Sequence, residues 1–516
     1  MKKIITLFAI SALVLTGCEK LLDIPQHGAQ GFEAYYSTDE EAETAINAAY
    51  IQLRSNYYNI YMGKTLLADD VWAGGGQRND NAEMEALNEY TFNSDQGFLQ
   101  GMFEGYYGVI YKCNVAIAHC TADTPTMHRV VAEAKVIRAM QYFDLITLWG
   151  NPPLVDHELS PSEYSRPNGT TEELWNLVNT DLKEAIESGC LVQKANVNDK
   201  VWRITKQYAQ ALLGKALLWQ EKYSEAAKYL NEVIDSNLYD LYPVFEDIYL
   251  YSNKMSCESL FESIRITNPS NAFENFDFTH LMLHWRTERF SMTAEMSQRF
   301  ESLQTGYGFM SPRKSLYDAF VAEEGVDGYR LNSSLKTTEQ FAEMGMTLKD
   351  ELIGEGIFDW KRRVEVAGID PSSYAFSYEG DPVWMRYGEV LLLAAEANLQ
   401  AGQQGIADQC LNKVRTRAQL ANKTATIETI QTEKRLELCY DMCRYQDLLR
   451  WGLAEKYLAS QGANYPVLQV NGNVKYVPLC DGDASKYGWK KGKNELLPYP
   501  GLETRLNSEI KQNPGW

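Results

Sequence analysis

Residues Thr205 to Ile234 read TKQYAQALLGKALLWQEKYSEAAKYLNEVI, and this stretch decides the fold class. It divides at Glu221-Lys222 into two segments with helical patterns. In the second segment the apolar residues recur with the three-to-four spacing of an amphipathic helix. Small residues, Gly214 and Ala226, stand where two antiparallel helices would touch. The stretch therefore predicts a helical hairpin.

This hairpin resembles a tetratricopeptide (TPR) repeat, which buries its apolar face only against stacked neighbours. A second copy is predicted at Glu389–Arg417, where Ala394, Ala395 and Ala407 fall on matching positions. A third hairpin is predicted to start with Val130–Trp149 and to resume at Thr171–Ile186 after a long loop. The sequence thus predicts a mostly α-helical protein built from several hairpins.

Charge excludes one class of partner. The chain has 516 residues, 45% of them hydrophobic, with 49 basic against 69 acidic residues and a net charge of −20. Such a balance repels nucleic acid and anionic membrane surfaces, and no basic run overrides it. We therefore expect no nucleic-acid partner.

The N-terminus has the features of an export signal. Lys2 and Lys3 precede an apolar run, Ile4 to Leu15, that is too short to span a bilayer permanently. The run ends in Leu15-Thr16-Gly17-Cys18, which resembles the lipobox of bacterial lipoproteins. That resemblance implies that Cys18 carries the lipid anchor. The alternative is an ordinary signal peptide with a chance cysteine.

The rest of the chain alternates between helical and irregular stretches. Ser37/Thr38 with Glu40/Glu41 form a capping-box signal for a helix through about Arg54. Helices are also predicted over Gln96–Cys120 and Met385–Trp451. Between Tyr239 and Arg386 Gly, Pro, Asn, Ser and aromatic residues dominate. That segment is too long for a structureless loop, so it predicts an irregular second lobe.

Motifs for catalysis and metal binding are sparse. His280 and His284 are four residues apart, but no glutamate follows His280 as a zincin requires. No Gly-x-Ser-x-Gly elbow and no phosphate loop is present. We therefore predict no catalytic residue, no metal site and no cofactor. The eight cysteines after Cys18 are interpreted mostly as small buried residues, with Cys439 and Cys443 on one helix.

Four stretches together resemble the SusD/RagB family of Bacteroidetes outer-membrane lipoproteins. They are the lipobox with Leu21-Leu22-Asp23-Ile24-Pro25; Ala132–Ala139 running into Tyr142–Leu145 and Trp149–Val155; Glu433–Leu438 with Arg444–Gly452; and the terminal Leu497-Pro498-Tyr499-Pro500 with Gln512–Trp516. Their order and spacing are more specific than any one of them.

The resemblance implies a mostly α fold in which TPR-like hairpins pack under a loop-rich, irregular ligand-binding lobe. It also implies a lipoprotein of the cell outer membrane, facing the exterior, that captures a nutrient and delivers it to a SusC-like TonB-dependent transporter. The nutrient is expected to be an oligosaccharide, with peptides as the alternative ligand of the RagB branch. The expected regions are a signal peptide (1–17), a lipidated tether (18–36), an N-terminal SusD-like region (37–238), the irregular lobe (239–384) and a C-terminal region (385–516).

Two other functions stay open on the sequence. Helical repeats often form pure protein-interaction scaffolds. A glycan-degrading enzyme needs two acids across a cleft, and such a pair leaves no local mark in a sequence. The charged motif residues on one predicted helix, Arg435, Glu437, Arg444, Asp447 and Arg450, are interpreted as ion pairs that lock the repeats. Asp327-Gly-Tyr-Arg330 is interpreted as a turn with an internal ion pair.

Candidate ligand-binding residues are loop aromatics with polar neighbours. Sugars present flat C–H faces that stack on aromatic rings, while their hydroxyls need Asn, Gln, Asp and Arg partners. Trp72 is the strongest candidate, because the glycines that follow it predict an exposed loop. The candidates are Trp72, Gln77, Arg78, Asn79 and Asp80 in the first loop, Trp285 and Arg286 in the second, and Tyr307 and Phe309 in the third.

Overall fold

A computed structural model of the chain describes residues 36–265, 278–301, 306–369, 378–479 and 483–516. The predicted signal peptide, Cys18 and almost all of the predicted tether lie outside the described residues, as does Cys480. Among the described residues, no helix is both long enough and apolar enough to cross a membrane.

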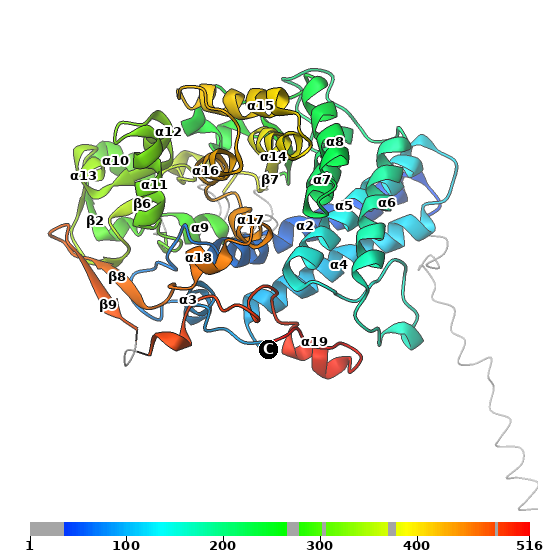
Figure 1. Cartoon of the computed structure of the whole chain (residues 1–516), viewed down its shortest axis with the longest axis horizontal. Helices are drawn as coiled ribbons and strands as arrows, with labels where there is room; N and C mark the ends of the chain where they lie inside the picture. The colour runs from blue at the N-terminus through cyan, green and yellow to red at the C-terminus, as the bar shows by residue number, and fades with distance from the viewer. Residues whose placement is uncertain (1–35, 266–277, 302–305, 370–377, 480–482) are drawn as a thin grey trace, which may run out of the picture.

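Long helices stack side by side and make up the right-hand part of the molecule in Figure 1. In the order α2, α4, α5, α6, α7, α8, α14 and α15, each packs on the next. Their bounds, with those of the other helices outside the lobe, are α2 (Asp39–Leu66), α3 (Ala82–Glu89), α4 (Gly97–His119), α5 (Pro125–Trp149), α6 (Thr171–Glu187), α7 (Lys206–Trp219), α8 (Tyr223–Asp235), α14 (Tyr387–Gln400), α15 (Gln404–Arg417), α16 (Ile427–Glu437), α17 (Arg444–Arg450), α18 (Ala454–Leu458) and α19 (Gly501–Leu506).

The predicted hairpins are confirmed and packed as expected. The α7–α8 pair corresponds to 205–234 and the α14–α15 pair to 389–417. A Cβ on Gly214 would lie 2.5 Å from Leu230 Cγ, so glycine permits the close approach of α7 and α8. Between the hairpins, Asn231 and Asn398 exchange side-chain hydrogen bonds of 3.1 and 2.9 Å. The fold is mostly α-helical, as predicted.

Two boundary predictions were wrong. The capped first helix does not end near Arg54 but continues to Leu66, because its residues stay buried beyond Arg54 and Gly63 still lies against Met102 of α4. The predicted helix through Trp451 is interrupted after Glu437, where Tyr440 and Met442 adopt positive φ angles of 67° and 60°. A right-handed helix requires negative φ angles. The helix therefore ends here, and the chain turns between α16 and α17.

That turn changes the interpretation of the residues around it. Cys439 and Cys443 lie in the turn and not on one helix, although both are buried as expected. Five of the seven described cysteines are buried, and all seven are free thiols. The charged motif residues are divided between α16 and α17, and they pair mostly with other segments. Arg444 binds Asp69 at 2.8 Å, for example.

Short helices and two- or three-stranded antiparallel sheets form the left-hand part of the molecule in Figure 1. The sheets pair β1 with β7, β2 with β4, β3 with β6, and β5 with β8 and β9. The bounds are α9 (Thr279–Leu283), α10 (Ala294–Phe300), α11 (Lys314–Glu324), α12 (Tyr329–Ser334), α13 (Thr338–Glu343), β1 (Ser259–Glu262), β2 (Phe290–Met292), β3 (Leu335–Thr337), β4 (Met346–Leu348), β5 (Leu352–Ile353), β6 (Ile357–Asp359), β7 (Val383–Arg386), β8 (Asn464–Leu468) and β9 (Val474–Pro478). Single turns of 3-10 helix are η3 (Pro161–Glu163), η4 (Phe245–Asp247), η5 (Tyr251–Asn253), η6 (Thr287–Arg289), η7 (Val366–Gly368) and η8 (Ala484–Lys486).

Buried charges join the irregular part to the helices. Arg330 of α12 is fully buried, and its guanidinium binds Glu324 at 2.8 Å and Glu433 at 2.5 Å. It does not pair with Asp327, so the predicted internal ion pair of that turn was wrong. Glu437 accepts bonds from Arg330, Arg386 and Arg417 together. A buried carboxylate shared in this way fixes the position of one segment against another.

Candidate functional site

The three predicted loops come together on one surface. The Gly75 N–H donates to the Gly308 carbonyl at 2.8 Å, and the Met310 N–H donates to the Ala73 carbonyl at 2.8 Å. Trp72 N–H donates to Ser311 O at 2.7 Å. The segment 72–75 therefore pairs along 308–311, although more than two hundred residues of sequence separate them.

This pairing explains the glycines. Gly74 has a φ of +78°, and a Cβ there would lie 2.5 Å from the Gly308 carbonyl oxygen. Only glycine permits so close an approach of two backbones. The prediction of an exposed loop was wrong for Ala73, Gly74 and Gly75, which are buried, whereas Gln77 and Asn79 are exposed. The glycines allow the two segments to approach each other closely, and they do not place this part of the loop in solvent.

Trp72 is half-buried. The Arg313 guanidinium carbon lies 3.6 Å from the centre of the indole ring, so one ring face carries a cation–π contact. Arg313 also donates to the Val71 carbonyl at 2.8 Å, and burial lowers the pKa of its guanidinium to about 10. The Trp72 indole nitrogen is buried and has no hydrogen-bond partner among the described residues. Trp72 is thus partly a packing residue.

Asp80 and Arg286 connect the first loop to the second. Arg286 Nη1 lies 3.1 Å from Asp80 Oδ2, and Arg286 Nε donates to Glu288 at 2.9 Å. Asp80 Oδ2 also accepts the N–H groups of Gly76 at 2.7 Å and Gln77 at 3.2 Å. The carboxylate of Asp80 therefore holds both loops in one arrangement.

Arg78 lies between two acids and an aromatic ring. Its guanidinium pairs with Glu85 at 2.9 Å and with Glu89, and it lies 5.6 Å from the centre of the Tyr465 ring. Burial opposes the charge, but the two carboxylates outweigh it and raise the pKa of Arg78. Burial raises the pKa of Glu89, against the lowering effect of Arg78. Asn79, at a positive φ of 68°, turns the chain here.

The other predicted aromatics are more deeply placed. Trp285 is 5% exposed, stacks on Trp360 with ring centres 5.7 Å apart, and donates its indole N–H to Asp359 O at 3.2 Å. Phe309 is 7% exposed and packs against the Gly75 segment. Tyr307 is half-buried, and its backbone N–H donates to Leu281 O at 2.7 Å. Trp285 and Phe309 line the same cavity beside Arg286, whereas Tyr307 does not.

That cavity is narrow. Its volume is about 30 Å³, and the neighbouring cavity lined by Trp72, Arg78 and Tyr465 measures about 20 Å³. Each holds about one water molecule. A ligand of several sugar units would therefore lie across this surface, against the side chains of Gln77, Asn79 and Arg286, and not inside it.

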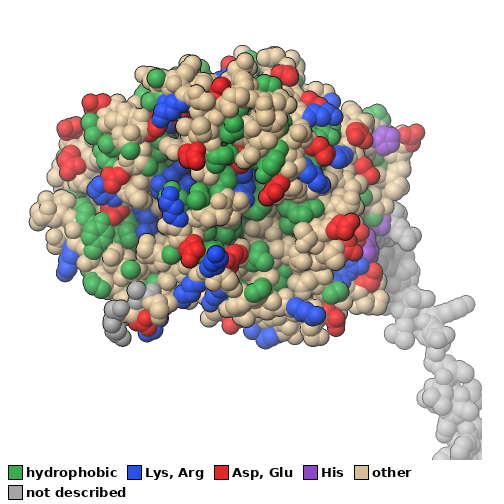
Figure 2. Space-filling model, viewed as in Figure 1, with side chains coloured by type: hydrophobic (Ala, Val, Ile, Leu, Met, Phe, Trp, Pro, Cys, Tyr) green, Lys and Arg blue, Asp and Glu red, His purple; other side chains and the backbone are tan. Residues whose placement is uncertain are grey.

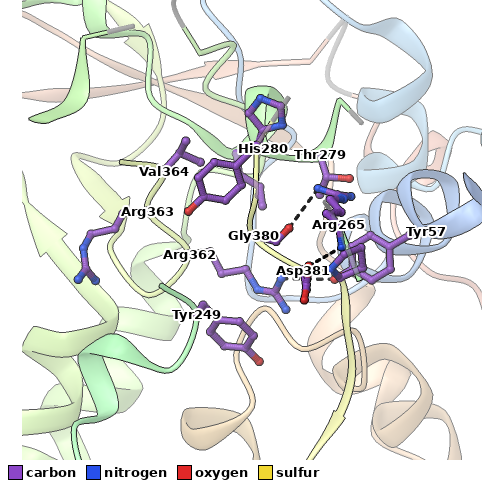
Figure 3. A pocket seen from close by; sticks show the side chains of 13 residues that line it. Tyr57, Tyr249, Arg265, Thr279, His280, Arg362, Arg363, Val364, Gly380 and Asp381 are labelled. Atoms are coloured by element: carbon purple, nitrogen blue, oxygen red, sulfur yellow. Dashed lines mark hydrogen bonds between the residues drawn. The ribbon is translucent and has the colours of Figure 1, made fainter. Parts of the chain in front are cut away.

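A second, charged cavity lies beside α9 and is shown in Figure 3. The Arg362 guanidinium carbon lies 4.9 Å from the Tyr61 ring and 4.1 Å from the Tyr249 ring, and Figure 3 shows the group directed toward Asp381 and Tyr57. Burial raises the pKa of Asp381 to about 6 and lowers that of Arg265 to about 10. At about 50 Å³, this cavity is also too small for a sugar unit.

The two histidines considered as metal ligands flank these cavities. His284 is buried, which lowers the pKa of its imidazole to about 4, and its Nε2 donates to the Phe300 carbonyl at 2.9 Å. His280 stacks on Tyr378 with ring centres 5.5 Å apart. Among the described residues, no group of three or more His, Cys, Asp or Glu side chains is arranged to hold a metal ion.

Several residues of these surfaces were not predicted from the sequence. Tyr465 on β8 lies beside Arg78, and Arg313 before α11 lies on the ring of Trp72. Both contacts depend on the tertiary fold, which leaves no local signal in the sequence. The charged cavity did have one signal. Lys361-Arg362-Arg363 is a run of three basic residues in an irregular and otherwise acidic chain.

Comparison with known proteins decides the family. Residues 361–516 match the model of the SusD family, and residues 34–218 match a SusD-like model described as starch-binding and associating with the outer membrane. The chain belongs to the SusD family. The SusD-like protein P2 of Formosa agariphila is 24% identical over the full length of both chains. A SusD-like protein of Bacteroides ovatus is 23% identical, over 90% of this chain and 85% of its own.

Solved structures with this SusD-like fold include glycan-binding proteins. A laminarin-binding SusD-like protein superposes with a TM-score of 0.78 at 24% identity, covering 92% of this chain and 99% of its own. Surface glycan-binding protein A from Bacteroides thetaiotaomicron, in complex with laminarihexaose, has a TM-score of 0.74 at 23% identity, covering 92% and 100%. At these identities the likeness establishes the SusD-like fold of the chain.

Proposed function

We propose that this SusD-like protein is a cell-surface lipoprotein that captures an oligosaccharide and delivers it to a SusC-like TonB-dependent transporter. The observation that carries the proposal is the convergence of the three predicted loops on one surface, held by the Arg286–Asp80 ion pair of 3.1 Å. The half-buried ring of Trp72 lies there together with amide, guanidinium and carboxylate side chains, which are groups that carbohydrate recognition uses.

The chemistry of this surface favours binding over hydrolysis. A glycosidase needs a carboxylic acid and a carboxylate that are available to transfer protons. Here Asp80 is engaged by two backbone N–H groups and by Arg286, and Glu89 is engaged by Arg78. Carboxylates held in this way orient loops. The two solved structures named above are also of proteins that are called laminarin-binding and glycan-binding.

The family supports the place that we propose for the protein. The family model that matches 34–218 is described as associating with the outer membrane. Cys18 in its lipobox-like motif is the proposed attachment point. A lipoprotein held beside a transporter raises the local concentration of ligand at the channel, since a tethered binding event becomes effectively intramolecular.

The test is calorimetric titration with a panel of hexasaccharides: laminarihexaose, maltohexaose, xylohexaose and mannohexaose. We expect at least one to bind, with no new reducing ends after prolonged incubation. Binding of the same ligand should weaken in Arg286→Ala and persist in Arg289→Ala, a neighbouring arginine outside the cavity. Release of shorter sugars would favour the enzyme alternative. Binding of peptides but of no panel member would favour the RagB-like role.

A further inference from the structure

A much larger cavity lies in the helical part of the molecule. Its volume is about 480 Å³, within the range of about 300–1,000 Å³ that is usual for ligand pockets. It lies where the ends of α5 and α7 meet the start of α6, helices α17 and α18, and the segment 489–496. None of its lining residues lines the surface proposed above for capture.

Two of the four stretches that resemble the SusD/RagB family border this cavity. Gly150 and Asn151 come from the stretch that follows α5, and Leu449, Arg450 and Gly452 come from α17 and the turn after it. In Figure 2, hydrophobic side chains gather near the centre of the face, with acidic and basic side chains around them. The motif residues therefore also border open space and do not only pack against one another.

Three tryptophans form the walls. Trp175 and Trp219 both meet Phe143 edge to face, with ring centres 6.2 and 6.0 Å apart and interplanar angles of 65° and 89°. Trp489 is 6% exposed, and its indole N–H donates to the Asn494 carbonyl at 2.9 Å. These contacts hold the rings in fixed orientations. Among the described residues, the indole N–H groups of Trp175 and Trp219 are not used in a hydrogen bond, and both rings are partly exposed.

The polar groups around the tryptophans are balanced in charge. Arg450 is neutralised by Glu396 and by Asp447, the latter at 3.0 Å. Glu455, Glu495 and Lys491 are exposed residues at the rim. A cavity with this lining has no excess positive charge that would attract an anion. A purely apolar ligand would also bind poorly, because it would remove water from the charged rim without replacing its hydrogen bonds. Flat apolar faces surrounded by hydrogen-bonding groups suit the faces and hydroxyls of a neutral sugar.

We propose that this cavity is a second saccharide-binding site, which takes one or two units of a neutral oligosaccharide. The proposal extends the proposed function to a separate site, because the ligand class is the same and the residues are different. Two sites on one chain would let the protein hold a long glycan at two points, which strengthens binding without any new contact at either site.

The test uses the same four hexasaccharides with the wild type, Trp219→Ala, Trp175→Ala and the control Trp202→Ala. Trp202 lies outside the cavity, against Arg203 and Tyr50. For a panel member that binds, we expect two sites per wild-type chain. One of them should weaken roughly tenfold or more in each cavity variant and stay unchanged in the control. Circular dichroism melting, with Trp219→Phe as a conservative variant, separates a lost contact from a lost fold.

Each other outcome has a distinct meaning. A single site that is weakened by Arg286→Ala and unaffected by Trp219→Ala would keep the proposed function and overturn this inference. A single site that responds only to the cavity tryptophans would support the inference and move capture away from the loops. If Trp219→Ala bound sugars normally but lost co-purification with an outer-membrane protein, the cavity would be a protein-docking site and the inference would be wrong. Absence of binding by every panel member would overturn both proposals.

Discussion

Arg286 Nη1 lies 3.1 Å from Asp80 Oδ2 across 206 residues of sequence, and this ion pair holds two predicted binding loops together. Both side chains are about one-fifth exposed, so solvent screens the pair. Its value lies in fixing where the loops stand and not in stability, since exposed pairs contribute only about 0.2–1 kcal/mol.

The Asp80–Arg286 pair is therefore expected to affect ligand affinity more than folding. We predict that Arg286→Ala and Asp80→Asn each weaken oligosaccharide binding by about 1 kcal/mol, and that the double variant loses less than the sum. Titration calorimetry on the four proteins of the cycle measures this coupling, with Arg289→Ala as control. Strictly additive losses would mean that the two residues act independently.

Trp72 is expected to matter for both binding and stability. We predict that Trp72→Ala weakens ligand binding by about 1–3 kcal/mol, the scale of one well-placed aromatic contact. An exposed ring would contribute little to stability, but the half-buried ring of Trp72 stacks on Arg313. We therefore expect about 2 kcal/mol of lost stability as well. Trp72→Phe keeps an aromatic ring, so it should retain most of the wild-type stability when unfolding is measured in urea. Normal affinity in a destabilised Trp72→Ala protein would make Trp72 a packing residue only.

Glu437 is expected to control stability in acid. Burial opposes its charge, but Arg417, Arg386 and Arg330 outweigh burial and lower the pKa of Glu437 to about 2. An unfolded glutamate titrates near about 4.3. Its contribution is therefore complete above that value and is lost as pH falls toward 2. We predict that Glu437→Gln destabilises the protein by about 3–5 kcal/mol at pH 7.

The difference in stability between the wild type and Glu437→Gln should shrink between about pH 4 and pH 2, because the wild-type carboxylate becomes protonated there. Urea midpoints across this range measure it. Glu428→Gln, an exposed position on the same helix α16, is the matched control and should change little. A constant difference down to pH 2 would show that shape, not charge, accounts for the effect.

Glu262 is expected to have the opposite effect of Glu437 on how stability depends on pH. Burial first, and the nearby carboxylate of Asp381 second, raise the pKa of Glu262 to about 7. The folded state then binds a proton that the unfolded state has released, so stability falls as pH rises from about 4 to 7. We predict that Glu262→Gln, which can still accept the Met255 N–H, is more stable than wild type at pH 8 by on the order of 2 kcal/mol. Melting temperatures at pH 5 and pH 8 test this, and equal shifts at both would contradict it.

Cys18 is expected to anchor the protein. We predict that Cys18→Ala leaves the membrane fraction, because a protein without acyl chains has no stable hold on the bilayer. Cell fractionation with immunodetection measures this, and Cys190→Ala, a half-buried free thiol, is the control. If Cys18→Ala stayed with the outer membrane in a strain that lacks the proposed SusC-like transporter, lipidation would not be the anchor.

The helical hairpins could be predicted from the sequence because their signals are local. Apolar spacing in 205–234 and 389–417 reports one face of each helix, and Gly214 reports the contact between two of them. The end of α16 had no such signal. The apolar residues Leu438 and Met442 continue the pattern, while the positive φ of Tyr440 and Met442 depends on neighbours far away in sequence.

The same distinction applies to the candidate site. Residue chemistry alone indicated the loops around Trp72, Trp285 and Phe309, and it suggested their polar partners. Only the tertiary structure brought the loops together, buried Trp285 against Trp360 and placed Arg313 on Trp72. Helix periodicity and residue chemistry are encoded over a few neighbouring residues, whereas the pairing of 72–75 with 308–311 depends on two segments that meet only when the whole chain has folded.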